Sequence, residues 1–159
     1  MKKLLRFICV VSIGAFVLTG CGDREDADGE VMTAKEFKTI MAEKGFSVVD
    51  QTESAADSSY QQIYVAVDEN KYSFEYYFMK DPNSANRVFD YAKDNLAEIY
   101  GDVTNAQIDE SGSDTDFTYS VSADDYYCEV IQRENAVLYV TSYPDYKDEA
   151  KTIMKELGY

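Results

Sequence analysis

Two pairs of strand-like segments constrain the fold of this chain most. Each pair is rich in Val, Ile, Tyr and Phe, and each is interrupted by the dipeptide Glu-Asn. The segments are 60–68 and 71–79 around Glu69-Asn70, and 126–133 and 136–142 around Glu134-Asn135. Two-residue loops join antiparallel strands and fix which residues face each other. The sequence therefore predicts two β-hairpins.

In the first hairpin, a two-residue turn places Asp68 opposite Lys71 and Tyr64 opposite Glu75. We expect one face in the core and the other in water. The expected core face carries Ile63, Val65 and Val67 against Tyr72, Phe74 and Tyr76.

The second hairpin is apolar on both faces. One face carries Cys128, Val130, Val137 and Tyr139, and the other carries Tyr127, Glu129, Ile131, Leu138 and Val140. A large apolar patch that stays exposed usually marks an interaction site. We therefore expect another part of the chain, or a partner, to pack on the second face. Either the C-terminal helix packs on it, or Tyr127, Ile131, Leu138 and Val140 form an interaction surface for a partner or a second copy.

Three helices are predicted from their caps and stops. Thr33-Ala34-Lys35-Glu36 forms a capping box, Asp81-Pro82 opens the longest helix, and Pro144-Asp145 opens the last. Gly45 and Gly158 end the outer two. Shorter strands are expected at 46–50, 103–109 and 117–121. The prediction is one α+β domain over residues 33–159, with a mainly antiparallel sheet and helices largely on one face.

A short internal similarity links the first and last helices. The pattern Lys-Thr-Ile-Met-x-Glu-x-Gly-aromatic occurs at 38–46 and at 151–159. This similarity is compatible with two αβββ-like units, or with a shared way of ending a helix.

Residues 1–20 have the pattern of a secretory signal. Lys2, Lys3 and Arg6 precede an apolar run of about twelve residues, which is shorter than the ~20 that a membrane-spanning helix needs. Leu18-Thr19-Gly20-Cys21 follows and resembles the lipobox of bacterial lipoproteins. The chain is similar to small lipoproteins of Gram-positive anaerobes. The resemblance implies that Cys21 carries a diacylglyceryl group and that the protein faces outward from the cell membrane.

Residues 21–32 have the composition of an acidic tether between this anchor and the domain. The whole chain has a formal charge of −15, and removal of residues 1–20 with their three basic groups changes it to −18. This acidic balance argues against nucleic acid as a partner. No His is present, which excludes Ser-His-Asp, Cys-His and His-zinc chemistry. We expect no cofactor and no metal site, and Cys128 is interpreted as a buried thiol.

The leading hypothesis is a non-catalytic binding module of the cell envelope that recognises a protein, a peptide or a small ligand. Tyr60, Tyr64, Tyr77 and Tyr127 are candidates for a recognition surface, although strand propensity explains them equally well. Two alternatives stay open. One is an envelope hydrolase that uses carboxylates alone, and the other is a structural or secretion-assisting subunit of an oligomer.

Overall fold

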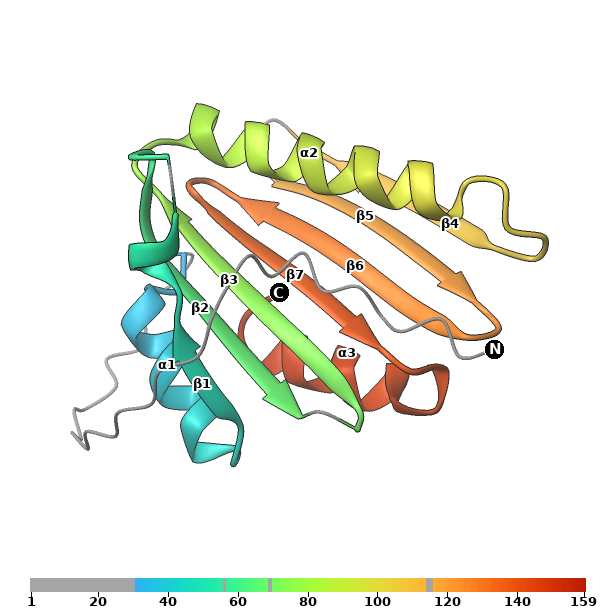
Figure 1. Cartoon of the computed structure of the whole chain (residues 1–159), viewed down its shortest axis with the longest axis horizontal. Helices are drawn as coiled ribbons and strands as arrows, with labels where there is room; N and C mark the ends of the chain where they lie inside the picture. The colour runs from blue at the N-terminus through green and yellow to red at the C-terminus, as the bar shows by residue number, and fades with distance from the viewer. Residues whose placement is uncertain (1–30, 56, 69, 114–115) are drawn as a thin grey trace.

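The computed structural model describes residues 31–159 apart from residues 56, 69, 114 and 115. The helices in this part of the chain are α1 (Ala34–Glu43), α2 (Pro82–Tyr100) and α3 (Lys147–Glu156). The strands are β1 (Ser47–Asp50), β2 (Tyr60–Asp68), β3 (Tyr72–Met79), β4 (Gln107–Gly112), β5 (Asp116–Ala123), β6 (Tyr126–Arg133) and β7 (Ala136–Ser142). They form one antiparallel sheet in the order β1-β2-β3-β7-β6-β5-β4 (Figure 1). The predicted α+β class is confirmed.

Most helix ends follow the local sequence signals, but the last helix does not begin at Pro144-Asp145 as expected. Residues Pro144–Tyr146 form a 3-10 turn, and α3 begins at Lys147. The Thr33 hydroxyl accepts a hydrogen bond from the Glu36 amide at 3.3 Å, and the Glu36 carboxylate accepts one from the Thr33 amide. Gly45 and Gly158 adopt φ values of 88° and 87°. The next residue in each case donates its amide hydrogen to a carbonyl five residues back, which closes the last turn. The similarity between 38–46 and 151–159 is thus a shared helix ending.

The register expected for the first hairpin is wrong by one residue. Asp68 pairs with Tyr72, not Lys71, so the loop between the strands has three residues. Tyr64 now lies opposite Tyr76, and Glu75 lies opposite Val65. Ile63 and Val65 of β2 therefore lie on one face of the sheet, and Phe74 and Tyr76 of β3 lie on the other.

The second hairpin has the register expected from its two-residue turn, with Arg133 opposite Ala136. The proposed interaction surface on it is not available. Its four residues, Tyr127, Ile131, Leu138 and Val140, are 1, 5, 0 and 0% exposed. They share one core cluster with buried residues of α1 and α3, among them Phe37 and Met154. The C-terminal helix α3 packs on this face, as one of the two alternatives predicted, and α1 packs on it as well.

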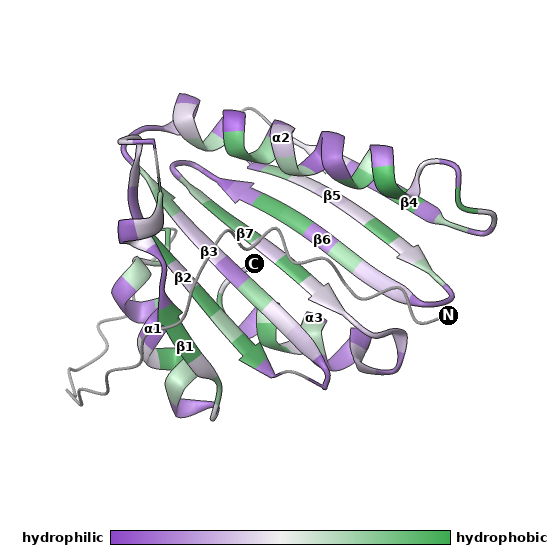
Figure 2. Ribbon diagram, in the orientation of Figure 1, coloured by the Kyte–Doolittle hydropathy of each residue, from purple (hydrophilic) through white to green (hydrophobic). Residues whose placement is uncertain are grey.

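Helices cover both faces of the sheet, which corrects the expectation that they lie largely on one. α1 and α3 pack behind the sheet in Figure 1, whereas α2 runs in front of it and buries Phe89 and Leu96 against β5, β6 and β7. Because α1 and α2 lie on opposite faces and α2 precedes four strands, the chain does not consist of two equivalent αβββ units. Every residue of the central strand β7 is buried. In Figure 2, α2 alternates between hydrophilic and hydrophobic segments, as an amphipathic cover should.

Packing on the α1 side begins before Thr33. Val31 and Met32, which the sequence assigns to the tether, pack against the cluster beneath α1. The Tyr76 hydroxyl donates a hydrogen bond to the Met32 carbonyl. The ring of Tyr76 also stacks on Phe37, with centroids 4.9 Å apart. The domain therefore includes at least these two residues of the expected tether.

Candidate functional site

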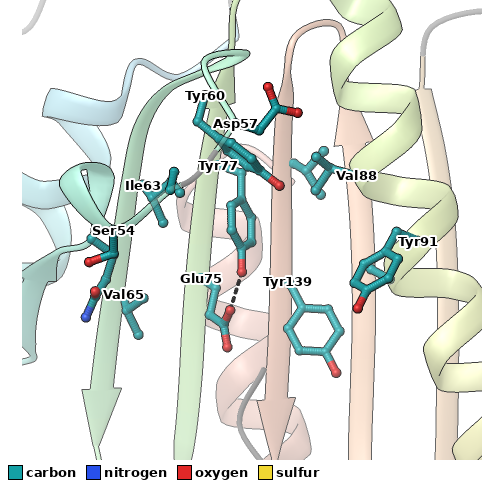
Figure 3. A pocket seen from close by; sticks show the side chains of 14 residues that line it. Ser54, Asp57, Tyr60, Ile63, Val65, Glu75, Tyr77, Val88, Tyr91 and Tyr139 are labelled. Carbon is teal, nitrogen blue, oxygen red and sulfur yellow. Dashed lines mark hydrogen bonds between the residues drawn. The ribbon is translucent and has the colours of Figure 1, made fainter. Parts of the chain in front are cut away.

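A pocket of about 390 Å³ opens on the α2 side of the sheet, at its β2–β3 half (Figure 3). Three parts of the fold enclose it: the sheet face of β2, β3 and β7, the first half of α2, and the loop before β2. Its lining is Gln51, Ser54, Ala55, Asp57, Tyr60, Ile63, Val65, Glu75, Tyr77, Val88, Tyr91, Ala92, Val137 and Tyr139. Most of these side chains are apolar or aromatic, as in small-molecule sites, whose volumes run from about 300 to 1,000 Å³.

Three hydrogen bonds fix the loop that closes one side of the pocket. The Ile63 amide donates to the Thr52 hydroxyl at 3.0 Å, and the Gln51 amide donates to the Ile63 carbonyl at 2.8 Å. At the other end of the loop, the Lys80 amide donates to the Ser59 carbonyl at 3.0 Å. The wall that carries Ser54 and Asp57 is thus attached to β2 and to the end of β3.

Glu75 is the chemically distinctive residue of the pocket. It lies in the middle of β3, between Val65 of β2 and Tyr139 of β7, and its residue surface is only 2% exposed. The Tyr77 hydroxyl donates a hydrogen bond to its carboxylate (Figure 3). Burial raises the pKa of Glu75 above its ordinary value, and the hydrogen bond from Tyr77 opposes part of that rise.

Four tyrosines from four different elements line the same space: Tyr60, Tyr77, Tyr91 and Tyr139. The rings of Tyr60 and Tyr77 lie 6.1 Å apart, centroid to centroid. Tyr91 projects from α2 and is 62% exposed, so it stands at the boundary between pocket and solvent. Tyr139 is buried, and burial raises the pKa of its hydroxyl. Tyrosine rings combine an apolar face with a polar hydroxyl group, and in this pocket the Tyr77 hydroxyl is already bonded to Glu75.

The charged side chains among the pocket residues are both acidic. Asp57 differs from Glu75 because it is exposed and accepts a hydrogen bond from the Ser59 amide at 2.8 Å. That hydrogen bond lowers the pKa of Asp57 below its ordinary value. Figure 3 shows Asp57 beside Tyr60 at one end of the pocket and Glu75 at the other, with Tyr77 between them. In this view the side chain of Tyr77 separates the two carboxyl groups.

The sequence indicated some of these residues and missed the most important one. Of the four tyrosines suggested for recognition, Tyr60 and Tyr77 meet in the pocket, whereas Tyr64 and Tyr127 are buried on the opposite face. Glu75 was expected on a wet face. Its position between Phe74 and Tyr76, in a run of large aromatic residues, is the signal that could have marked it as a buried carboxyl group.

The remaining predictions from the sequence concern the two cysteines Cys21 and Cys128, metal sites and membrane-spanning segments. Cys21 and the rest of the lipobox lie outside the described residues. Cys128 is 1% exposed, and burial raises the pKa of its thiol to about 12. Among the described residues, no group of three or more His, Cys, Asp or Glu side chains is placed to hold a metal ion. The helices described there include none with the length and apolarity to cross a membrane.

Comparison of the chain with protein-family models, with curated proteins and with solved structures found no match.

Proposed function

We propose that this chain is a membrane-anchored lipoprotein outside the cytoplasm that acts as a non-catalytic binding module of the cell envelope. The observation that carries the binding role is the pocket beneath α2, which combines apolar walls with one buried carboxyl group. A small ligand is a better match to this pocket than a protein, because the broad apolar face suggested for a partner is covered by α1 and α3.

The lipobox at residues 18–21 supports the anchoring half of the proposal. A single acyl chain binds a bilayer only marginally, whereas two chains give stable attachment, which a diacylglyceryl group on Cys21 would supply. Acidic residues between 21 and 32 would repel an anionic membrane surface over a Debye length of ~8 Å. The binding domain would then stand off the lipid with its pocket accessible.

The alternatives drawn from the sequence have less support. A hydrolase that relies on carboxylates needs two of them about 5–10 Å apart in one cleft. In this pocket Asp57 is exposed and has a lowered pKa, and Tyr77 lies between it and the buried Glu75 in Figure 3. An oligomer subunit needs an uncovered interface, and the surface suggested for one is buried. Both alternatives stay predictions.

The anchor is tested by metabolic labelling with radioactive palmitate. The wild-type chain should be labelled and should sediment with membranes, and Cys21→Ser should lose both properties. Cys9→Ser is the matched control, because it changes a cysteine of the signal and leaves the lipobox intact. An unlabelled wild type, or a Cys21→Ser variant that is labelled equally, would overturn the anchoring proposal.

Ligand binding is tested with a neutral probe, 2-phenylethanol, by ligand-observed NMR on the full chain in phospholipid nanodiscs. Ala92 lines the pocket and Ala97 is exposed on the same helix. We expect Ala92→Trp to fill the space and weaken binding at least tenfold, while Ala97→Trp leaves binding unchanged. Equal effects of the two substitutions on the binding of 2-phenylethanol would contradict a binding role for the pocket.

A further inference from the structure

We propose that the ligand of this pocket is an organic amine, whose ammonium group lies against the Glu75 carboxylate and whose apolar body lies among the tyrosine rings. The inference rests on the proposed binding function and assigns a chemical class to its ligand. Four features of the pocket support it: the sign of its charges, the burial of Glu75, the aromatic lining and the apolar walls.

The charge of the pocket favours a cation. No Lys or Arg is present among the described residues that line it, and its two charged side chains are Asp57 and Glu75. The chain as a whole carries a formal charge of −15, which raises the local concentration of cations around it. An anionic ligand would be repelled by the two acidic side chains of the pocket and by the negative charge of the whole chain.

The position of Glu75 favours a ligand with several hydrogen-bond donors. A buried carboxylate is costly to maintain unless a charge or hydrogen bonds compensate it. Tyr77 supplies one neutral donor through its hydroxyl group. An ammonium group carries three donors and the opposite charge. It would satisfy carboxylate oxygen positions that face the pocket and would neutralise the buried charge at the same time.

The tyrosines favour a cation as well. A cation over the face of a tyrosine is attracted by the electrons of the ring. The fold already uses this contact elsewhere, where the Lys147 and Lys151 ammonium groups lie 4.9 and 5.4 Å from the centroid of Tyr127. In the pocket, Tyr77 and Tyr139 lie beside Glu75 and offer rings to a cation that a ligand would bring.

The walls limit what the rest of the ligand can be. Ile63, Val65, Val88, Ala92 and Val137 give the pocket an apolar surface that matches an aromatic or branched aliphatic body. A sugar or a multiply charged ligand would leave polar groups unpaired against these side chains. The cavity of about 390 Å³ accommodates a small aromatic amine. The class that fits is therefore a singly charged, amphipathic amine.

Three probes of similar size separate the contribution of charge from that of the apolar body: 2-phenylethylamine, 2-phenylethanol and 3-phenylpropionate. Each is titrated calorimetrically into the full chain in phospholipid nanodiscs, with empty nanodiscs as the blank. We expect the amine to bind at least tenfold more tightly than the alcohol, and the carboxylate to bind more weakly than either.

Two substitutions locate the effect. Glu75→Gln keeps the shape of the side chain, and we expect it to reduce the affinity for the amine to that for the alcohol. Glu98→Gln removes the same charge from the exposed surface of α2, and it should leave both affinities unchanged. The comparison of amine with alcohol on the wild-type protein does not depend on whether either variant folds.

The outcomes distinguish this inference from the proposed function. If the alcohol and the amine bind the wild type equally, or if Glu75→Gln binds the amine as tightly as the wild type does, the amine class is wrong and a neutral-ligand pocket stands. If none of the three probes binds, both the amine class and the binding role of the pocket are overturned.

Discussion

Glu75 should make the stability of the folded protein depend on pH in a way that one substitution removes. Burial raises the pKa of this carboxyl group above its ordinary value of 4.5 in the folded state only. Between that value and the raised one, the folded protein holds a proton that the unfolded chain has released. The free energy of unfolding therefore falls as pH rises through this window.

The maximum slope of this pH dependence and the groups that contribute to it follow from the structure. A single group contributes at most about 1.4 kcal/mol per pH unit to the slope. Three other pocket residues shift away from this range: the pKa of Asp57 is lowered, and burial raises the pKa of Tyr60 and of Tyr139. Glu75 is thus the pocket residue expected to titrate at a pH above 4.5 in the folded protein.

The measurement is urea unfolding of the full chain at half-unit steps from pH 4 to pH 8, followed by circular dichroism. The quantity of interest is the difference in unfolding free energy between Glu75→Gln and the wild type. We expect it to move in favour of Gln as pH rises, by up to about 1.4 kcal/mol per unit, and to level off above the folded pKa. The exposed control Glu98→Gln should show a difference that stays constant within about 0.5 kcal/mol.

A flat difference for Glu75→Gln across the whole range would refute the reasoning. It would mean that Glu75 has the same pKa in the folded and unfolded states, and therefore that water reaches its carboxylate. A difference that moves in favour of the wild type as pH rises would mean that a cationic or hydrogen-bonding partner stabilises the ionised form in the protein without ligand.

Two further predictions concern the core. Leu138→Ala should lower the unfolding free energy by about 2–5 kcal/mol, because this side chain is fully buried beneath α1 and α3. The control Ile108→Ala, on the edge strand and 44% exposed, should lower it by less than about 1 kcal/mol. Equal losses in urea titrations would contradict the packing of that face. Cys128 should resist maleimide at pH 8 until the protein unfolds, since its thiol is buried and has a raised pKa. Peptide mass mapping separates it from Cys9 and Cys21, and rapid labelling in the native state would disprove its burial.

Local sequence signals predicted the elements well. Both central hairpins have nearly the expected strand ends, and the Asp81 and Thr33 caps are present with their hydrogen bonds. Caps, turns and glycine stops act over three to five residues, so they can be recognised without knowing the rest of the fold. The strand at 107–112 was placed too early because its turn-rich residues suggested a loop.

Local sequence signals did not predict the register of the first hairpin. The prediction assumed one wet face, so it aligned Ile63 and Val65 with Phe74 and Tyr76 to form a single apolar face. In the structure both faces are covered, so apolar residues can lie on either one and alternation no longer selects the register. The added loop residue shifts Glu75 opposite Val65 and into the space beneath α2.

The sequence by itself determined the α+β class, the two hairpins, most of the helix ends, and the lipobox on which the proposed anchor rests. Only the tertiary structure decided that α1 and α3 cover the face carrying Leu138 and Val140, and that Glu75 lies in a tyrosine-lined pocket. The physical reason is that these arrangements depend on contacts between segments distant in the chain. The β3–β7 pairing and the packing of α2 across the sheet bring Glu75, Tyr139 and Tyr91 together, although no short stretch of sequence contains all three.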